Sequence, residues 1–295
     1  MKDLNLINFY QQFPDEQACL EYLEQVRWPN GRACPHCGSV KTYRFKSGKL
    51  FKCGDCKMQF TAKVGTIFTD THVPLQKWFL SIYLLTSRKK GTSSVQLAKD
   101  LKITQKSAWF VLHRIRYAME HGIDKPIDTP SEIDATWVGG KSTSKLRFAN
   151  KVAVMGIAEK QKGTGRIVTR LTKYEDATVA IDFLRKTVKK GSVIHSDEGS
   201  AYTNLKREYA HEIVVHSKNE YVRNGVSTNQ IDGAWNHLKL GLKATYMGVS
   251  VKHLPLFLQE FQTRYNSREL TDGERFGEWF SGVNGKHLPY KSLIS

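Results

Sequence analysis

The spacing of apolar residues divides the chain into a helical first part and a second part in which strands and helices alternate. Apolar positions recur every three or four residues from Asp15 to Val26, and again within 92–101 and 104–119. This periodicity predicts three amphipathic helices. Residues 31–62 lack it and are rich in glycine, lysine and cysteine, which predicts short hairpins.

The second part begins after a segment with one glycine and two prolines, Gly122 to Pro130, which predicts a linker. Strands are predicted at 131–138, 151–158, 166–172, 192–196 and 212–216. Helices are predicted at 176–189, 199–208, 228–243 and 251–267. Three strands followed by alternating helices and strands indicate an α/β domain with a mixed sheet and flanking helices.

These patterns predict five parts of the chain. They are an N-terminal helical segment (1–30), a cysteine-bearing hairpin region (31–62), a helical basic region (63–121), an α/β domain (131–270) and a C-terminal tail (271–295). The sequence contains neither a repeat of 20–50 residues nor a low-complexity tract, which argues against solenoids.

Composition narrows the class of protein. With 295 residues, 40% hydrophobic and 25% charged, the chain can bury a core and is not wholly disordered. Lysine and arginine (45) exceed aspartate and glutamate (28), and the formal net charge of +17 favours a polyanionic partner. The N-terminus does not resemble a signal peptide, and the longest apolar run, Trp78 to Leu85, is too short to span a bilayer. We expect a soluble, cytoplasmic protein with no membrane partner.

Four of the five cysteines form two Cys-x-x-Cys pairs 15 residues apart: Cys34, Cys37, Cys53 and Cys56. This spacing is typical of a structural Zn²⁺ site, although buried cysteines with accidental spacing remain the alternative. Four thiolates complete a tetrahedron, so the metal would stabilise the fold and would not activate water. We expect His36 to lie on the surface and Cys19 to be a buried thiol. Basic residues of the same region would contact phosphates.

The helical patterns at 92–101 and 104–119 are joined by a short turn, which predicts a helix-turn-helix with Thr104 as N-cap of the second helix. In that helix Ala108, Leu112, Ile115 and Met119 should face the core, and Lys106, Trp109, His113 and Arg116 the opposite side. As a DNA-binding element it would place Gln105, Lys106 and Trp109 near base edges, and Arg114 and Arg116 at phosphates. An ordinary helical hairpin with a solvated charged face is the alternative.

Three aspartates of the α/β domain stand where functional groups are expected. Asp134 lies within the first strand, Asp197 just after a later strand, and Asp232 in the first turn of a helix. On that helix Asp232, Asn236 and Lys239 share a face, and Ser227 and Gln230 suggest a capping box. Glu132 and Glu198 are set aside because they are expected to alternate away from the key acids.

Together the three carboxylates would hold two Mg²⁺ ions for an in-line phosphoryl transfer. Each also has a purely structural explanation. Asp134 could be a satisfied polar strand residue, Asp197 a turn residue, and Asp232 a helix N-terminal acid that the macrodipole favours.

Several stretches resemble a DDE transposase of bacterial insertion sequences, in the group with a zinc ribbon ahead of an ISXO-like catalytic core. They are Cys34–Gly38, Gly65–Phe68, Lys77–Phe79, Ala108–Phe110, His113–Arg116, Ile133–Lys141, His195–Asp197, Asn229–Lys239, Lys252–Leu254 and Glu260–Arg268. They extend over nearly the whole chain, and their joint occurrence is more specific than any single motif.

The resemblance implies a ribonuclease-H-like fold and a DNA transposase. Such an enzyme would bind terminal inverted repeats, cleave strands with Mg²⁺ or Mn²⁺, and transfer the freed 3′ ends into target DNA. Matching positions make Asp134 and Asp197 the first two metal ligands. The third position is commonly glutamate in the family and is Asp232 here, with Lys239 at the family's seven-residue offset. Arg264, Tyr265, Asn266 and Arg268 would pack and bind DNA backbone.

The partners implied are double-stranded DNA, as transposon ends and as target, and further copies of the chain in a homodimer or higher oligomer on nucleoid DNA. Two alternatives stay open from the sequence. One is a non-catalytic, zinc-dependent DNA-binding regulator with a degenerate ribonuclease-H-like core. The other is a ribonuclease-H-like nuclease.

Overall fold

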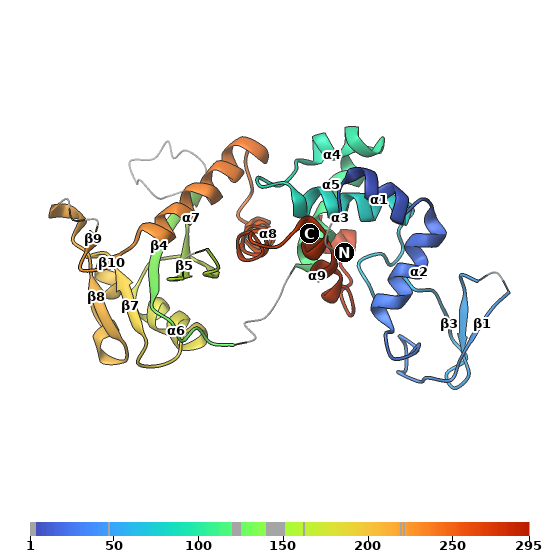
Figure 1. Ribbon diagram of the computed structural model, residues 1–295, viewed down its shortest axis with the longest axis horizontal. Helices are drawn as coiled ribbons and strands as arrows, with labels where there is room; N and C mark the ends of the chain where they lie inside the picture. Colours follow the sequence, from blue (N-terminus) through green and yellow to red (C-terminus); the bar gives the residue numbers. More distant parts are fainter. Residues whose placement is uncertain are drawn as a thin grey trace. The chain divides into compact units, whose positions relative to one another are not determined.

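The chain folds into two compact units (Figure 1), as seen in a computed structural model that describes residues 4–46, 48–119, 125–139, 151–161, 163–218, 220 and 222–294. The first unit comprises residues 1–120 and 270–295, and the second comprises residues 121–269. We refer to them as the helical unit and the sheet unit. The predicted linker from Gly122 lies partly outside the described residues.

Helices dominate the helical unit. They are α1 (Leu6–Gln12), α2 (Glu16–Arg27), α3 (Leu75–Ser87), α4 (Ser94–Leu101), α5 (Gln105–Ala118), α9 (Asp272–Ser281) and α10 (Tyr290–Ile294). Asp15, Ser93 and Thr104 each accept a backbone hydrogen bond as N-cap, which confirms the predicted N-cap Thr104. Cys19 is fully buried, as expected.

Aromatic side chains form the core of the helical unit. Phe9 of α1, Phe79 of α3 and Phe276 of α9 are fully buried and belong to one hydrophobic cluster. Trp279 and Phe280 extend it. The prediction that residues 271–295 form a tail is therefore wrong, because α9 packs on α3 and buries its apolar stripe there.

The cysteine-bearing region of the helical unit is a small three-stranded antiparallel sheet. Its strands are β1 (Thr42–Arg44), β2 (Phe51–Cys53) and β3 (Gln59–Phe60). Phe51 and Phe60 are its main buried apolar side chains, and they pack beside Cys34, Cys53 and Trp28. So small a core agrees with the expectation that a metal stabilises this region.

The sheet unit is built on a five-stranded mixed sheet in the order β6-β5-β4-β7-β8. The strands are β4 (Ser131–Gly139), β5 (Lys151–Glu159), β6 (Ile167–Thr172), β7 (Val193–Ser196) and β8 (Ala210–Ile213). The pairs β4–β5 and β5–β6 are antiparallel, and the pairs β4–β7 and β7–β8 are parallel. This mixed α/β arrangement confirms the predicted fold class.

Helices cover both faces of this sheet. One face carries α6 (Ala177–Thr187), whose Phe183 and Leu184 share a hydrophobic cluster with Ile133 and Met155 of the strands. The other face carries α7 (Asn229–Leu240) and α8 (Leu254–Asn266). In Figure 1, α7 lies along β4 and β5.

Three details of the sheet unit differ from prediction. The helix expected at 199–208 is two 3₁₀ turns, Ser200–Tyr202 and Leu205–Arg207, and the hydroxyl of Thr203 between them bonds back to the Ser200 carbonyl oxygen. β8 begins earlier than the strand predicted at 212–216. A hairpin of β9 (Val222–Arg223) and β10 (Val226–Ser227) was not predicted, although Asn-Gly, with positive φ at both residues, is a strong hairpin signal.

Within the described part of the chain, no helix is both long and apolar enough to cross a membrane.

Candidate functional site

The four paired cysteines form a site whose dimensions fit zinc. The sulfur atoms of Cys34, Cys37, Cys53 and Cys56 all lie within 4.8 Å of one another. Two of the separations are 3.7 and 3.6 Å. A tetrahedron with Zn–S bonds of about 2.3 Å has edges of about 3.8 Å, so these residues could hold a structural Zn²⁺ without rearrangement. His36 is exposed, as expected, and donates its backbone N–H to the Cys34 sulfur.

Asp134 lies within β4, on the strand at the centre of the sheet. Burial, with the charges of Asp197 and Asp232 as smaller contributions, raises its pKa to about 7. Its Oδ2 atom accepts a hydrogen bond of 2.8 Å from the Trp235 indole N–H. This carboxylate is therefore fixed through one oxygen and lies close to two other acids.

Strand register places Asp197 beside Asp134. In the parallel pair β4–β7, Ser131 lies opposite Ile194 and Glu132 opposite His195. Continuing that register by two residues sets Asp197, just past the end of β7, level with Asp134. The Oδ1 atom of Asp197 accepts the backbone N–H of Gly199 at 2.9 Å, which holds the carboxylate in a tight turn.

Asp232 comes from the first turn of α7, which covers the same region of β4. The Thr228 hydroxyl donates to its Oδ2 atom at 3.1 Å. Asp232, Asn236 and Lys239 are all exposed, which agrees with the shared helix face predicted for them.

The three carboxylates therefore gather at one place, but they are not packed as tightly as the cysteines. Among the described residues, only the four cysteines have ligand atoms all within 4.8 Å of one another. If they bind divalent ions, these carboxylates would supply the oxygen ligands for a pair of metal ions in phosphoryl transfer. Asp134 lies close enough to Asp197 and Asp232 that both charges act on its pKa.

A fourth carboxylate near these acids was missed. Glu175, just before α6, accepts a 3.0 Å hydrogen bond from the Tyr202 hydroxyl. Burial raises the pKa of Glu175, and the charge of Asp197 adds to the rise. Burial also raises the pKa of Tyr202, with contributions from Asp134 and Glu175. No sequence pattern points to Glu175, because it lies in a loop.

Gly156 allows α7 to approach the sheet. Gly156 pairs with Asp134 across β4 and β5. A Cβ atom there would lie 2.5 Å from the Trp235 ring and 3.1 Å from Ile231. The absence of a side chain therefore lets the Trp235 indole lie over β5 and reach Asp134.

The expectation that Glu132 points away from Asp134 is wrong. Residues two apart on a strand share a face, so Glu132 points to the same side of β4 as Asp134. Its carboxylate accepts the backbone N–H groups of Gln230 and Ile231 and the Ser227 hydroxyl. The capping box suggested for Ser227 and Gln230 does not form, because a carboxylate from the sheet occupies that position.

Glu198 is also more than a neighbour of Asp197. Its carboxylate accepts the backbone N–H groups of His216 and Ser217. These hydrogen bonds lower the pKa of Glu198 to about 2. Glu198 thereby fixes the short 3₁₀ turn His216–Lys218 beside the acids.

The predicted orientation of α5 is partly wrong. Ala108, Leu112, Ile115 and Met119 are buried as expected, but His113, Arg114 and Arg116 are also buried, with exposed fractions of 1%, 3% and 2%. Arg114 donates to the backbone oxygens of Ile67, Thr69 and Leu288. The sequence suggested an exposed arginine face, but the loop after β3 and the segment after α9 cover that side. Arg114 and Arg116 are therefore not available for phosphates in this fold.

The start of α5 remains accessible. Gln105 and Lys106 are exposed, and Trp109 is half-buried with its ring against His113. The Gln105 side chain donates to the Ser94 hydroxyl at the start of α4, which ties the two helices together. These three predicted base-contacting residues thus lie together at the N-terminal end of the second helix.

The family-like residues at the end of α8 bind β6 and the turn that precedes it. The Asn266 side-chain amide exchanges two hydrogen bonds with the backbone of Ile167. Arg268 donates to the Gly165 carbonyl oxygen and stacks on Tyr265. The packing part of the expectation for this stretch is therefore observed.

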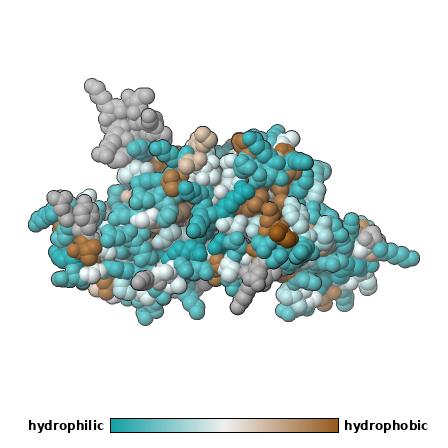
Figure 2. All heavy atoms as spheres, turned by 45° about the horizontal axis from the view of Figure 1, so that its top comes forward, coloured by the Kyte–Doolittle hydropathy of each residue, from teal (hydrophilic) through white to brown (hydrophobic). Residues whose placement is uncertain are grey.

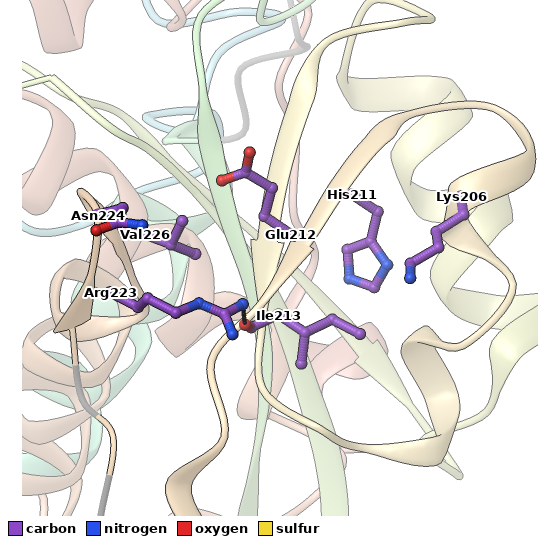
Figure 3. A pocket seen from close by; sticks show the side chains of 7 residues that line it. All are labelled: Lys206, His211, Glu212, Ile213, Arg223, Asn224 and Val226. Carbon is purple, nitrogen blue, oxygen red and sulfur yellow. Dashed lines mark hydrogen bonds between the residues drawn. The ribbon is translucent and has the colours of Figure 1, made fainter.

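A pocket of about 340 Å³ lies beside β8 (Figure 3). It is lined by Lys206, His211, Glu212, Ile213, Arg223, Asn224 and Val226, none of which was predicted as a site residue. The Ser196 hydroxyl donates to the Asp197 carbonyl oxygen, so it accepts a hydrogen bond of 2.8 Å from Nε2 of His211. The pocket is thus linked to the strand end that carries Asp197.

Comparisons with known proteins match the regions that contain the cysteines and the aspartates. An ISXO2-like transposase domain model matches residues 128–266, and a transposase zinc-ribbon domain model matches residues 14–59. An uncharacterized protein in the transposable element ISH50 of Halobacterium salinarum is 26% identical over 277 residues, which is 85% of this chain and 91% of that protein. A chain of the simian T-cell lymphotropic virus intasome in complex with PP2A regulatory subunit B56 gamma aligns with 60% of this chain and 67% of its own length. Its identity is 15% and its TM-score 0.32, too low to support an argument.

Proposed function

Because this chain belongs to the family of transposases with a zinc ribbon and an ISXO2-like domain, we propose that it acts on the ends of its own insertion sequence. It binds the terminal inverted repeats, cleaves DNA at these ends and joins the freed 3′ ends to target DNA. The main support for this chemistry is that the side chains of Asp134, Asp197 and Asp232 come from three different elements and lie near one another.

The acid cluster fits divalent metal ions. Three carboxylates offer the hard oxygen ligands that Mg²⁺ and Mn²⁺ prefer. Asp134 has a pKa raised to about 7, because burial and the neighbouring charges of Asp197 and Asp232 disfavour its ionised form. Divalent cations would compensate this accumulated negative charge. When bound, two such ions would activate the attacking hydroxyl and stabilise the leaving oxygen.

The residues around the metals have distinct roles in this proposal. Trp235 holds Oδ2 of Asp134. Thr228 orients Asp232. Asp232 is one methylene shorter than the glutamate common in the family, and the close approach of α7 over Gly156 suits the shorter side chain. Lys239, on the same helix face, contacts a phosphate of the bound DNA.

DNA binding is assigned to the helical unit and to the overall charge. Gln105, Lys106 and Trp109 contact base edges from the start of α5. The net charge of +17 contributes phosphate attraction, and Figure 2 shows hydrophilic residues over most of the face it draws. Two ends must be held together for transposition, so we propose that a homodimer or higher oligomer assembles on DNA.

The first experiment replaces each acid by its amide. Asp134→Asn, Asp197→Asn and Asp232→Asn should each reduce Mg²⁺-dependent cleavage of DNA carrying the element's ends by at least roughly 100-fold, the scale on which loss of one pre-organised charged group acts. Binding of the same DNA should be unchanged. Asp176→Asn is the matched control, because Asp176 is the exposed N-cap of α6 and asparagine caps a helix equally well. Full cleavage by the Asp232 variant would remove Asp232 from the metal site.

The same assay separates the alternatives. Binding without cleavage by the wild-type protein, in Mg²⁺ and in Mn²⁺, would identify a non-catalytic regulator. Cleavage without joining of a 3′ end to new DNA would identify a nuclease. Salt titration of binding should give a slope of about −0.9 in log K per neutralised phosphate, and a flat response would contradict the proposed phosphate contacts.

A further inference from the structure

Glu132 is a buried carboxylate with an unusual set of partners. Its exposed fraction is 1%, and it lies on β4 two residues before Asp134, on the same face. One oxygen, Oε2, accepts the backbone N–H groups of Gln230 at 2.8 Å and Ile231 at 2.9 Å. The other, Oε1, accepts the Ser227 hydroxyl at 3.2 Å. A buried carboxylate is costly unless such partners satisfy it, and here they come from the start of α7.

These bonds are the ones that a helix N-cap side chain normally accepts. The N-cap of α7 is Thr228, but its side chain makes no capping hydrogen bond. Glu132 takes over this function from the neighbouring strand, with its negative charge at the positive end of the helix dipole. Burial raises the pKa of Glu132, and the N–H of Ile231 and the charge of Lys160 oppose that rise.

Because Glu132 caps α7, the Thr228 hydroxyl is available for a hydrogen bond to Asp232. It donates to Oδ2 of Asp232 at 3.1 Å, so it accepts from Nε2 of His216, which lies 3.1 Å away. Glu198, the residue after Asp197, accepts the backbone N–H of His216. A chain of hydrogen bonds thus runs from the residue beside the second acid to the third acid.

We propose that Glu132 and Thr228 are positioning residues of the acid site. Glu132 caps α7 from β4 and so sets Asp232 at a fixed distance from Asp134, while Thr228 orients the Asp232 carboxylate. This inference rests on the proposed function, because it assigns the two residues to the same metal site.

The test measures metal binding directly, without DNA. Mn²⁺ is titrated into the zinc-loaded, full-length protein and free Mn²⁺ is followed by electron paramagnetic resonance. Thr228→Val keeps the shape of the side chain and removes the hydroxyl, so Mn²⁺ affinity should fall about 10- to 100-fold, as for other residues that orient metal ligands. Thr228→Ser should restore it. Asp134→Asn and Asp232→Asn define the loss expected when a ligand itself is removed.

Glu132→Gln tests the cap. It should weaken Mn²⁺ binding to a similar degree and speed the amide hydrogen exchange of Gln230 and Ile231 at least tenfold, with the exchange of β5 unchanged. Glu159→Gln is the matched control. Glu159 is another buried carboxylate that accepts a backbone N–H, that of Arg166, and as the partner of Ser131 it faces the opposite side of the sheet from Glu132. Its variant should keep Mn²⁺ affinity within about twofold of wild type.

The outcomes separate the two proposals. Weakened Mn²⁺ binding in Thr228→Val and Glu132→Gln supports the positioning role, even if the wild-type protein fails to cleave DNA and the proposed function fails. Wild-type affinity in Thr228→Val, unchanged amide exchange in Glu132→Gln, or no Mn²⁺ binding by the wild-type protein overturns the positioning role, whatever the cleavage assay shows.

Discussion

At the scale of single residues, the sheet unit places several buried carboxylates close together. Asp134, Glu175 and Glu132 all have raised pKa values because they are buried. The sequence identified Asp134 because an acid inside an apolar strand requires an explanation. It could not identify Glu175, whose proximity to Asp197 depends on how the loop before α6 folds.

His211 provides a residue-scale prediction about pH. Burial, Lys206 and His195 lower its pKa to about 4 from an ordinary 6.5, and Figure 3 shows the Lys206 amine beside its ring. Between pH 4 and pH 6.5 the His211 side chain binds more protons in the unfolded chain than in the folded protein. The stability that the neutral His211 side chain contributes is therefore complete above pH 6.5 and is lost as the pH falls towards 4. Lowering the pH from 7.5 to 5 should therefore reduce the free energy of unfolding of the wild-type protein by about 1–2 kcal/mol more than that of the His211→Gln variant.

Urea unfolding at the two pH values measures this difference. His36→Gln, at an exposed position in the zinc ribbon, serves as control and should follow the wild-type protein. An equal loss of stability in wild type and His211→Gln would contradict the assignment.

At the scale of elements, the acid site depends on how closely α7 approaches the sheet. Glu132 attaches the first turn of the helix, and Trp235, one turn later, lies over Gly156 and bonds Asp134. The sequence predicted α7 and its acidic N-terminus. It did not predict the capping residue, because this residue lies about 100 positions earlier, on another element.

Gly156→Ala tests the close approach. The added methyl group would lie 2.5 Å from the Trp235 ring, so α7 must move or the ring must rotate. We expect a loss of about 1–3 kcal/mol in the free energy of unfolding, together with reduced DNA cleavage. Gly277→Ala in α9 is the control, because no heavy atom lies within 4 Å of its added Cβ and alanine favours a helix. Equal stability of the two variants in chemical denaturation would refute the packing argument.

The zinc ribbon gives a second prediction at this scale. Its strands have two or three residues each, and Phe51 and Phe60 are its only large, fully buried apolar side chains within the described part of the chain. Removal of zinc by a chelator should therefore unfold residues 31–60 and leave the sheet unit folded.

Hydrogen exchange followed by mass spectrometry would show this as lost protection in 31–60 only. Cys34→Ser should behave like the chelated protein, and Cys19→Ser, away from the site, should retain zinc. Protection of 31–60 that persists without metal would show that the ribbon does not need it.

At the scale of the whole molecule, the chain returns to its first unit after completing the second. Residues 270–295 belong to the helical unit, and Phe276 packs against the rings of Phe13 and Phe79. The C-terminal segment is therefore part of the core that supports the DNA-binding elements proposed above.

Phe276→Ala should accordingly destabilise the helical unit by about 3–5 kcal/mol, the usual cost of removing a buried phenylalanine ring. Calorimetry of the full-length protein should show an earlier transition for this unit and an unchanged one for the sheet unit. Ile294→Ala, whose side chain is exposed, should leave both transitions in place. A lack of effect in Phe276→Ala would mean that α9 does not contribute to this core.

The sequence by itself determined the features that local periodicity and spacing encode. These are the main helices with the N-cap Thr104, the strands of the mixed sheet and its α/β class, the cysteine spacing that the sulfur geometry fits, and the positions of three aspartates on their elements. Only the tertiary structure decided which faces are covered. It buried Arg114 and Arg116, brought α9 into the helical unit, and placed Glu132 at the start of α7. Burial and long-range hydrogen bonds depend on residues far apart in the chain, and no local pattern records them.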